Sequence, residues 1–285
     1  MLSVAHDRPV DPLTLAILRR VDSLVQELGI DYFVAGAIAR DILMTGVFGL
    51  DTGRATRDVD LAVAVEGWAQ FEAIKSRLID TGQFAPAGKP AQRLYYRLQA
   101  DTKGYPLDII PFGGVEQASG TIAWPPDHAE VLNVAGFRDV LGSAIKVEIE
   151  PGFAVPVASL PGLAILKLFA WIDRGNEDPK DALDLAILLR KYADAGNDGR
   201  LYREEIGILE AVEYDVSLAG ARLLGKDVGK ITAPATRDRI LALLDDAKSS
   251  DRLVTDMAKA LRAGEDPIAT AEGFLQQFKA GLQEG

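Results

Sequence analysis

Cysteine is absent from the 285-residue chain, which excludes disulfide bridges and metal sites built on thiolates. Only two histidines, His6 and His128, are present, so a zinc site built on histidines is not expected. The longest apolar run, 160–172, is interrupted by Pro161 and Lys167 and is too short to span a bilayer. The N-terminus has no basic stretch followed by an apolar core, the pattern of a secretory signal. We therefore expect a cytoplasmic protein that makes no membrane contact.

Positive charge is also scarce. The chain has 31 Lys and Arg residues against 42 Asp and Glu residues, which gives a formal net charge of -11. Because nucleic acid is held mainly by cationic side chains, this balance argues against a broad nucleic-acid-binding surface. A local basic groove stays open, and its candidates are Lys89, Arg93, Arg97 and Lys103. The alternative is that these charges form the solvated face of a hairpin.

The remaining composition, 48% hydrophobic and 26% charged, is that of a globular protein. Short apolar or alternating segments predict strands at 32–35, 58–65, 94–99, 105–111, 129–134 and 144–149, with a turn at 101–104. Helical spacing predicts helices at 11–28, 37–44, 68–80, 160–173, 179–192, 202–213, 216–225, 236–247 and 251–263. We therefore expect an α+β fold, with a mixed sheet and flanking helices in a first domain (1–155) and a helical second domain (156–285).

Two carboxylates interrupt the apolar segment RDVDLAV. Asp58 and Asp60 are two residues apart, so in a strand they project from the same face, while Val59 and Leu61 face the opposite way. Two adjacent carboxylates repel each other unless a cation lies between them. Oxygen ligands of this kind suit Mg²⁺ or Mn²⁺. On its own the pattern also fits two exposed acids at the end of a strand.

Two further features favour the metal. Gly36-Ala37 ends a predicted strand and opens a helix, and free backbone N–H groups at a helix start favour a phosphate. Arg40, one turn later, is placed to contact the same phosphate or to pair with a carboxylate. Asp108 lies in the apolar segment YPLDIIPF, where a buried acid needs a positive partner. We therefore expect Asp108 to face the first two acids, as in sites for phosphoryl or nucleotidyl transfer.

The segments FVAGAIARDIL, TRDVDLAV and LDIIPF resemble the nucleotidyltransferase superfamily with the polymerase β-type fold. The resemblance implies that Asp58, Asp60 and Asp108 are the catalytic and metal-binding acids, and that the third acid helps to activate the attacking hydroxyl. It also implies that Gly36, Ala37 and Arg40 contact the nucleotide. The family usually has Gly-Gly or Gly-Ser where this chain has Gly36-Ala37, so one hydroxyl contact to phosphate is missing here.

A second motif lies in LKLFAWIDRGNEDPKDALDLAILL. Lys167 and Arg174 are seven residues apart and share one face of a predicted helix. Asp178 and Pro179 are a strong start signal for the next helix, with Asp181 in its first turn. A helix hairpin held by surface ion pairs would explain these acids. It explains less well why Lys167 lies within an apolar run, although its stem could extend to water.

This block resembles the K…R…[KR]-D-x-x-D-L pattern of AbiEii/AbiGii-type nucleotidyltransferases, which include toxins of toxin–antitoxin systems. The resemblance covers roughly residues 30 to 190 and assigns Lys167, Arg174, Lys180 and Asp184 to nucleotide binding. It implies an enzyme that uses Mg²⁺ or Mn²⁺ to move NMP from an NTP to an acceptor hydroxyl, with the helical domain completing the nucleotide and acceptor site. The acceptor, tRNA, protein or a small molecule, and a partner antitoxin are left open.

Other interpretations remain. The turn VAGAIARD is also similar to that of tRNA CCA-adding enzymes and poly(A) polymerases, but the arginine-rich helix that selects the nucleotide in those enzymes is not evident between 108 and 160. The same residues could form a nucleotide-binding module without catalysis, although a relic of this kind would tend to have lost an acid. A phosphohydrolase would normally bring metal-binding histidines, and only two histidines are present.

Overall fold

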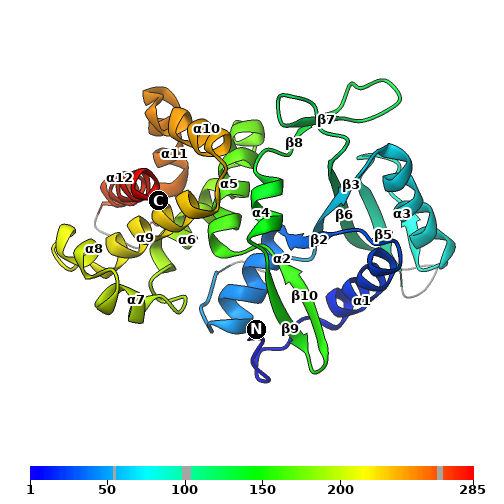
Figure 1. The fold of residues 1–285 in the computed structure, drawn as a ribbon, viewed down its shortest axis with the longest axis horizontal. Coiled ribbons are helices and arrows are strands. Elements are labelled where there is room, and N and C mark those ends of the chain that lie inside the picture. Colours follow the sequence, from blue (N-terminus) through cyan, green and yellow to red (C-terminus); the bar gives the residue numbers. More distant parts are fainter. Residues whose placement is uncertain (54–55, 98–103, 262–265) are drawn as a thin grey trace. The chain divides into compact units, whose positions relative to one another are not determined.

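The structure is a computed structural model that describes residues 1–53, 56–97, 104–261 and 266–285. The chain divides into two compact units, Met1–Ser159 (unit 1) and Leu160–Gly285 (unit 2), and each is described by itself. The predicted boundary at residue 155 falls within the last strand of unit 1, four residues before this division. The α+β class is confirmed, because unit 1 is built on a mixed sheet and unit 2 is helical (Figure 1).

Unit 1 contains a mixed sheet whose described strands follow the order β1-β9-β10-β2-β3-β6-β5-β4, with a separate hairpin, β7-β8. Its strands are β1 (Leu2–Ser3), β2 (Tyr32–Ala35), β3 (Val59–Val65), β4 (Phe84–Pro86), β5 (Arg93–Tyr96), β6 (Tyr105–Gly113), β7 (Thr121–Ala123), β8 (Val131–Asn133), β9 (Ile145–Glu150) and β10 (Phe153–Val157). Its helices are α1 (Pro12–Glu27), α2 (Gly36–Asp41), α3 (Trp68–Asp80) and α4 (Phe137–Gly142), and α2 continues into a π-helical turn, η1 (Ile42–Val47).

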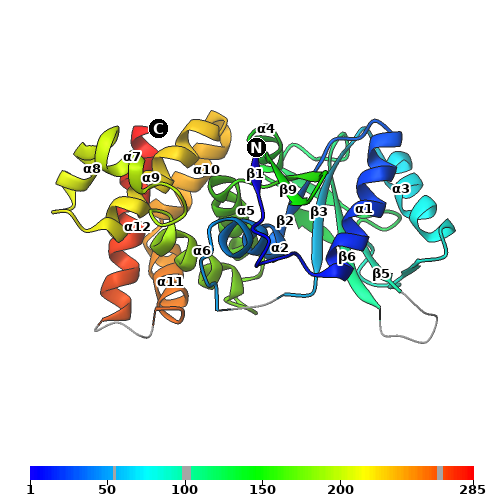
Figure 2. The same ribbon diagram turned by 90° about the horizontal axis from the view of Figure 1, so that it is seen from below.

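The strand β3, near the centre of this sheet, shows the alternation of residues that a strand requires. In β3 the residues Val59, Leu61, Val63 and Val65 are buried, whereas Asp60 on the other face is partly exposed. β3 pairs antiparallel with β2 and parallel with β6, and the three strands run side by side (Figure 2). This pairing places the site, because it aligns the acids of β3 and β6 across neighbouring strands.

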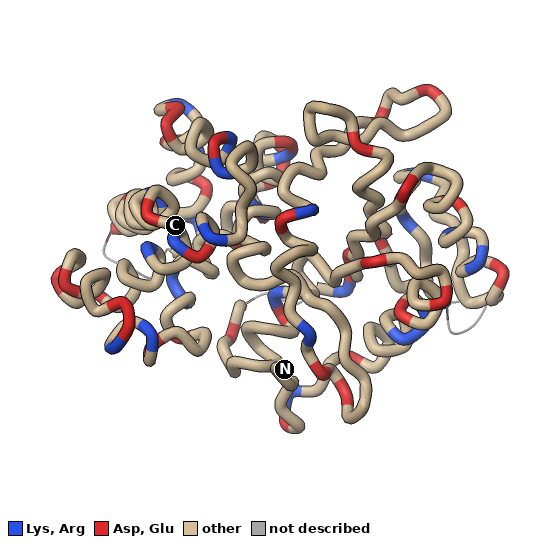
Figure 3. The backbone as a smooth tube through the Cα atoms, in the orientation of Figure 1, with Lys and Arg blue, Asp and Glu red and all other residues tan. Residues whose placement is uncertain are grey.

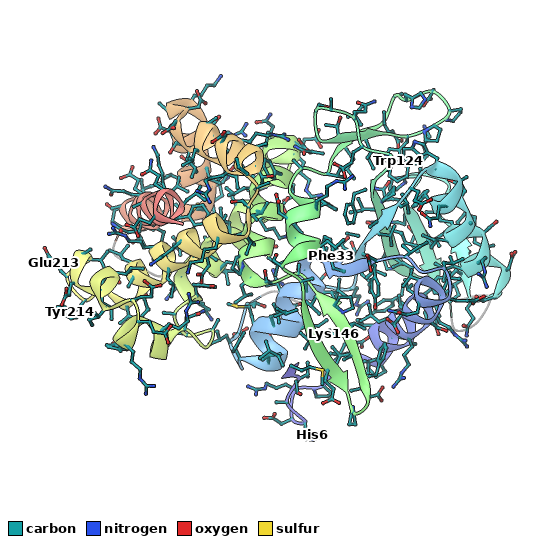
Figure 4. All side chains as sticks on the ribbon, viewed as in Figure 1. His6, Phe33, Trp124, Lys146, Glu213 and Tyr214 are labelled. Atoms are coloured by element: carbon teal, nitrogen blue, oxygen red, sulfur yellow. The ribbon has the colours of Figure 1, made fainter. Side chains whose placement is uncertain are left out.

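Aromatic side chains fill the core of unit 1. Phe33 of β2 lies in its interior (Figure 4), with its ring centroid 5.9 Å from that of Phe112 and 6.0 Å from that of Phe137. A second cluster joins the β7-β8 hairpin to α3, because Trp124 packs against Trp68 and Phe71. Burial of such rings removes large apolar areas from water and holds the sheet against its helices.

Unit 2 consists of helices α5 (Leu160–Arg174), α6 (Lys180–Lys191), α7 (Asp198–Arg203), α8 (Ile206–Ala211), α9 (Val216–Ile231), α10 (Pro234–Asp245), α11 (Ala247–Ala258) and α12 (Pro267–Glu284). Helices α9 and α12 approach closely because glycines face each other's backbone. A Cβ built on Gly225 would lie 2.0 Å from the carbonyl oxygen of Phe278, and one on Gly281 would lie 1.9 Å from that of Arg222. Larger residues at these positions would push the two helices apart.

Several element predictions need correction. The predicted helix 202–213 is two short helices, α7 and α8, and α12 was missed altogether. Helix α4 and strands β1, β4, β7 and β10 were also missed, although strands β2, β5 and β8, which have four residues or fewer, were predicted. The predicted turn at 101–104 and the end of the predicted helix 251–263 lie largely outside the described residues. Among the described helices, none is long and apolar enough to cross a membrane.

Candidate active site

Two of the three acids predicted from the sequence, Asp60 and Asp108, lie in one row across the sheet of unit 1. Ala35 of β2 is the register partner of Asp60 in β3, and Asp60 is the partner of Asp108 in β6. Arg93 of β5 is in turn the partner of Asp108. Register partners on neighbouring strands project from the same face with Cβ atoms about 5 Å apart. The predicted proximity of Asp60 and Asp108 is therefore built into the backbone.

Asp58 stands just before β3, two residues from Asp60 and on the same face. Its side chain is 50% exposed, and its backbone N–H donates to Thr56 Oγ1 at 3.3 Å. Asp60 is also partly exposed. Both residues therefore remain open to solvent.

The glycine turn lies directly against Asp60. Gly36 has a φ of +64°, and a Cβ built there would lie 1.9 Å from Asp60 Oδ2. Glycine is required at this position both by the left-handed backbone and by the approach of the carboxylate. The predicted phosphate-binding turn, Gly36-Ala37, thus adjoins the second acid.

Arg40 is buried in α2 rather than directed at solvent. Its side chain is 2% exposed, and its Nε and Nη2 atoms donate to Asp41 Oδ1 at 2.9 and 2.7 Å. Of the two roles considered for it, contact with phosphate or pairing with a carboxylate, this arrangement shows the second. A direct contact with nucleotide stays a prediction.

Asp108 meets the positive partner that its burial requires, and the partner is Arg93. Arg93 Nε donates to Asp108 Oδ1 at 2.8 Å and Nη2 donates to Oδ2 at 2.7 Å, a two-bond fork. The same Nη2 lies 3.8 Å from Asp58 Oδ2. These hydrogen bonds to Asp108 raise the pKa of Arg93. The sequence placed Arg93 in the basic patch, just before the predicted strand 94–99, and did not assign it to the site.

This result changes the interpretation of the basic patch. Lys89 and Arg97 are exposed, whereas Arg93 is partly buried against Asp108, and Lys103 lies outside the described residues. Lys and Arg positions are scattered among acidic ones elsewhere in the structure (Figure 3). Arg93 therefore belongs to the acid row, and neither a solvated face nor a nucleic-acid groove accounts for it.

The donor set fits a hard divalent cation. Asp58 and Asp60 offer carboxylate oxygens on one face, beside a turn suited to phosphate, and Mg²⁺ is typically held by one or two carboxylates together with substrate phosphates. In the described part of the chain, no group of three or more His, Asp or Glu side chains is arranged to hold a metal ion. Asp58 and Asp60 are therefore the candidate metal ligands, whereas the Asp108 carboxylate is hydrogen-bonded to Arg93.

A pocket of about 320 Å³ lies in unit 1, beside α2 and η1. It is lined by Arg8, Pro9, Val10, Asp11, Thr14, Ile38, Asp41, Ile42, Thr45, Gly46, Asp51 and Thr56. Ile38 directly follows the glycine turn in the sequence, and Thr56 accepts the hydrogen bond from the backbone N–H of Asp58. Neither the glycine turn nor Asp58, Asp60 or Asp108 lines this pocket, whose volume is in the range of small-molecule sites.

Unit 2 holds the second predicted motif as a buried ion cluster. Lys167 Nζ of α5 lies 3.0 Å from Asp181 Oδ1 and 2.6 Å from Asp184 Oδ2, both on α6. Arg174 Nε lies 2.7 Å from Asp181 Oδ2, so Lys167 and Arg174 do share one face. The Lys167 side chain is only 9% exposed, which excludes the interpretation of a stem reaching to water.

The pKa of Asp181 and the exposure of the charged side chains distinguish this cluster from the ion pairs of a surface helix hairpin. Burial raises the pKa of Asp181, but hydrogen bonds from Arg174 and the charge of Lys167 outweigh burial, so the pKa lies below its ordinary value. Lys180 and Arg174 remain partly exposed, and Lys180 Nζ lies 3.4 Å from Asp178 Oδ2. The carboxylates are therefore internal, whereas two cations at the edge of the cluster are reached by solvent.

Acids aligned on neighbouring strands beside a glycine turn are suited to transferring a nucleotidyl group, and the chain is a nucleotidyltransferase. A family model matches residues 43–277, well over half of the chain, and its description is Nucleotidyl transferase AbiEii toxin, Type IV TA system. The chain belongs to this AbiEii family. The match includes the three acids and the cluster of unit 2, whereas the glycine turn precedes it.

Solved structures with some likeness were also found. A nucleotidyltransferase-like antigenic protein from Paracoccidioides brasiliensis is 14% identical, with a TM-score of 0.44 over 74% of this chain and 94% of that chain. The Thermotoga maritima CCA-adding enzyme bound to tRNA is 14% identical, with a TM-score of 0.33 over 96% of this chain and 82% of that one. No curated protein matches the chain.

Proposed function

We propose that the protein transfers NMP from an NTP to an acceptor hydroxyl with the help of Mg²⁺ or Mn²⁺ bound at Asp58 and Asp60. The observation that carries the proposal is the register of the sheet, which sets the glycine turn, Asp60 and Asp108 on adjacent strands. Triphosphate oxygens and a divalent cation need such a combination of backbone N–H groups and carboxylates.

In the proposed reaction an acceptor oxygen forms a bond to the α-phosphorus, the bond from that phosphorus to the bridging oxygen breaks, and pyrophosphate leaves. The turn at Gly36-Ala37 offers N–H groups to the triphosphate. Asp58 and Asp60 hold the cation, which supplies Lewis-acid stabilisation of the charge that develops on the phosphate. Asp108 receives the proton of the acceptor hydroxyl, either directly or through water.

Unit 2 is proposed to contribute charged groups to nucleotide binding. Arg174 and Lys180 are the partly exposed cations of the ion cluster, with side chains 46% and 41% exposed, so they are the ones available to a phosphate. Lys167 is held by Asp181 and Asp184, so its proposed contact with phosphate requires it to leave at least one of these carboxylates. Asp184 then acts as the residue that positions Lys167.

Membership of a family described as toxins of type IV toxin–antitoxin systems supports a role as such a toxin. The proposal predicts that expression of the protein slows growth of a bacterial host, and that a partner antitoxin relieves this effect. The acceptor is proposed to be tRNA or a protein, since both carry hydroxyl groups to which NMP can be transferred. Growth of cells expressing the wild type or Asp60→Asn tests the toxin role, and equal growth would contradict it.

The enzymatic proposal is tested by incubating the purified protein with each α-³²P-labelled NTP, Mg²⁺ and either total RNA or total protein. Label should appear on one acceptor class, depend on Mg²⁺ and be accompanied by pyrophosphate release. A parallel reaction with γ-³²P-labelled NTP should label no acceptor, because the γ-phosphate leaves. Label from the γ-position would instead indicate phosphoryl transfer, and no label from either position would indicate a binding module without catalysis.

A further inference from the structure

The third acid and the second acid are turned in opposite directions. Asp60 and Asp108 are direct register partners, yet the Asp60 carboxylate lies against Gly36, on the β2 side of its strand. The Asp108 carboxylate is engaged with Arg93, on the β5 side. The backbone thus brings the two acids together while their carboxylates point to different partners.

The guanidinium of Arg93 also reaches the first acid. Its Nη2 atom is 2.7 Å from Asp108 Oδ2 and 3.8 Å from Asp58 Oδ2, so one nitrogen lies between two of the three acids. The Asp108 side chain is 12% exposed, and that of Arg93 is 26% exposed. A fork of two hydrogen bonds in a partly desolvated setting is stronger than an exposed ion pair. Arg93 is therefore a partly buried cation beside the carboxylates proposed to bind metal.

We infer that Arg93 is a positioning residue that competes with the divalent cation: it holds Asp108 away from Asp58 and Asp60, and metal binding at full strength requires Asp108 to leave this fork. The inference rests on the proposed function, because it assumes that the acids hold a metal. The basic groove and the solvated hairpin face considered for Arg93 from the sequence do not explain why it donates two hydrogen bonds to the buried Asp108.

The positive charge of the Arg93 guanidinium is the physical reason for its competition with the metal ion. Mg²⁺ needs oxygen ligands at about 2.0–2.1 Å, and a guanidinium placed between two of the available carboxylates repels the ion and occupies lone pairs of Asp108. Removal of that charge should leave the acids more negative and free to turn toward the metal. The same removal leaves Asp108 without its fork, which should destabilise the metal-free protein. Metal affinity and metal-free stability should therefore change in opposite directions.

The test measures Mn²⁺ binding without nucleotide, by electron paramagnetic resonance of free Mn²⁺, for the wild type and Arg93→Gln. Arg93→Gln should bind Mn²⁺ about tenfold more tightly, a change equivalent to about one pKa unit of interaction. It should also show a lower thermal midpoint without metal and a larger rise in midpoint with Mg²⁺. Arg97→Gln makes the same change of charge at an exposed position of the same segment, and it should leave Mn²⁺ affinity unchanged within about twofold.

Arg93→Lys keeps the charge but loses the two-nitrogen fork, so its Mn²⁺ affinity should fall between those of the wild type and Arg93→Gln. If Arg93→Gln does not fold, the Mn²⁺ affinity of Arg93→Lys tests the inference. Equal or weaker Mn²⁺ binding by the variants, or an equal loss of midpoint with and without Mg²⁺, would overturn the inference and show a structural ion pair only. Nucleotide transfer by the wild type tests the proposed function separately, since active enzyme with unchanged metal affinity in the variants overturns only the role of Arg93.

Discussion

Lys167 offers a stability prediction whose size follows from the ion cluster of unit 2. Lys167 and Arg174 balance Asp181 and Asp184, so the four side chains are neutral as a set. Lys167→Met keeps most of the apolar stem but leaves one excess negative charge among side chains that are 0 and 4% exposed. Removal of one partner from a buried pair costs about 3–5 kcal/mol. Because Asp181 keeps its ion pair with Arg174, we expect Lys167→Met to lower the free energy of unfolding by about 3 kcal/mol, the lower end of this range.

The measurement is urea unfolding followed by the fluorescence of Trp171, which lies one turn after Lys167 on α5. Replacing Trp68 and Trp124 by Phe in every protein leaves Trp171 as the only tryptophan, so that the signal reports on unit 2. Lys230→Met is the matched control, because Lys230 Nζ lies 3.2 Å from Asp227 Oδ1 with a side chain that is 49% exposed. Because Lys230 is half-exposed and the buried Asp227 keeps its hydrogen bonds from Arg200 and Tyr192, Lys230→Met should cost less than about 1 kcal/mol.

Addition of Asp184→Asn to Lys167→Met removes the excess charge and should recover more than half of the lost free energy of unfolding. This double variant also separates stability from nucleotide binding. If Lys167 contacts triphosphate, the double variant should be stable yet bind NTP poorly. A loss in Lys167→Met no larger than that in Lys230→Met would refute the reasoning, because the cluster would then behave as surface charges.

Further predictions concern the glycine turn and Asp181. Gly36→Ala and Gly29→Ala should each lose about 1–2 kcal/mol through a positive φ, but only Gly36→Ala should reduce transfer at least about tenfold, because Gly29 has nothing within 4 Å of an added Cβ. Equal transfer by the two variants would contradict the contact with Asp60. Since the folded-state pKa of Asp181 is lowered, its stabilisation is present above its ordinary value of 3.8 and is lost as pH falls through the folded pKa. The difference in unfolding midpoint between wild type and Asp181→Asn should therefore be large at pH 7 and shrink below pH 4, and a difference independent of pH would argue against it.

Much of the acid row could be predicted because its causes are local. Alternation along a strand sets Asp58 and Asp60 on one face, and the cost of burying a lone carboxylate identifies Asp108 as an acid that must meet charge. The shared face of Lys167 and Arg174 follows from helical spacing in the same way. These features depend on neighbours within about seven residues, which a single sequence displays.

Partners across strands and helices could not be predicted in this way. Arg93 meets Asp108 only because β5 pairs with β6 in one register, and a shift of one residue would turn Arg93 to the other face. The burial of Asp184 against Lys167 likewise depends on how α5 packs on α6. The omission of α12 was avoidable, because Asp266 and Pro267 carry the same start signal as Asp178 and Pro179, and Asp266 does cap that helix.

The central claim is that carboxylate-bound metal at β3 drives nucleotide transfer, and Asp60→Asn tests it most directly. Wild type and Asp60→Asn are compared at equal concentration for transfer of label from α-³²P-labelled NTP, with thermal midpoints recorded to confirm folding. Because the metal contributes several kcal/mol to transition-state stabilisation, the account predicts a loss of transfer of at least about a hundredfold at nearly unchanged midpoint. Transfer by folded Asp60→Asn at the wild-type rate would contradict it.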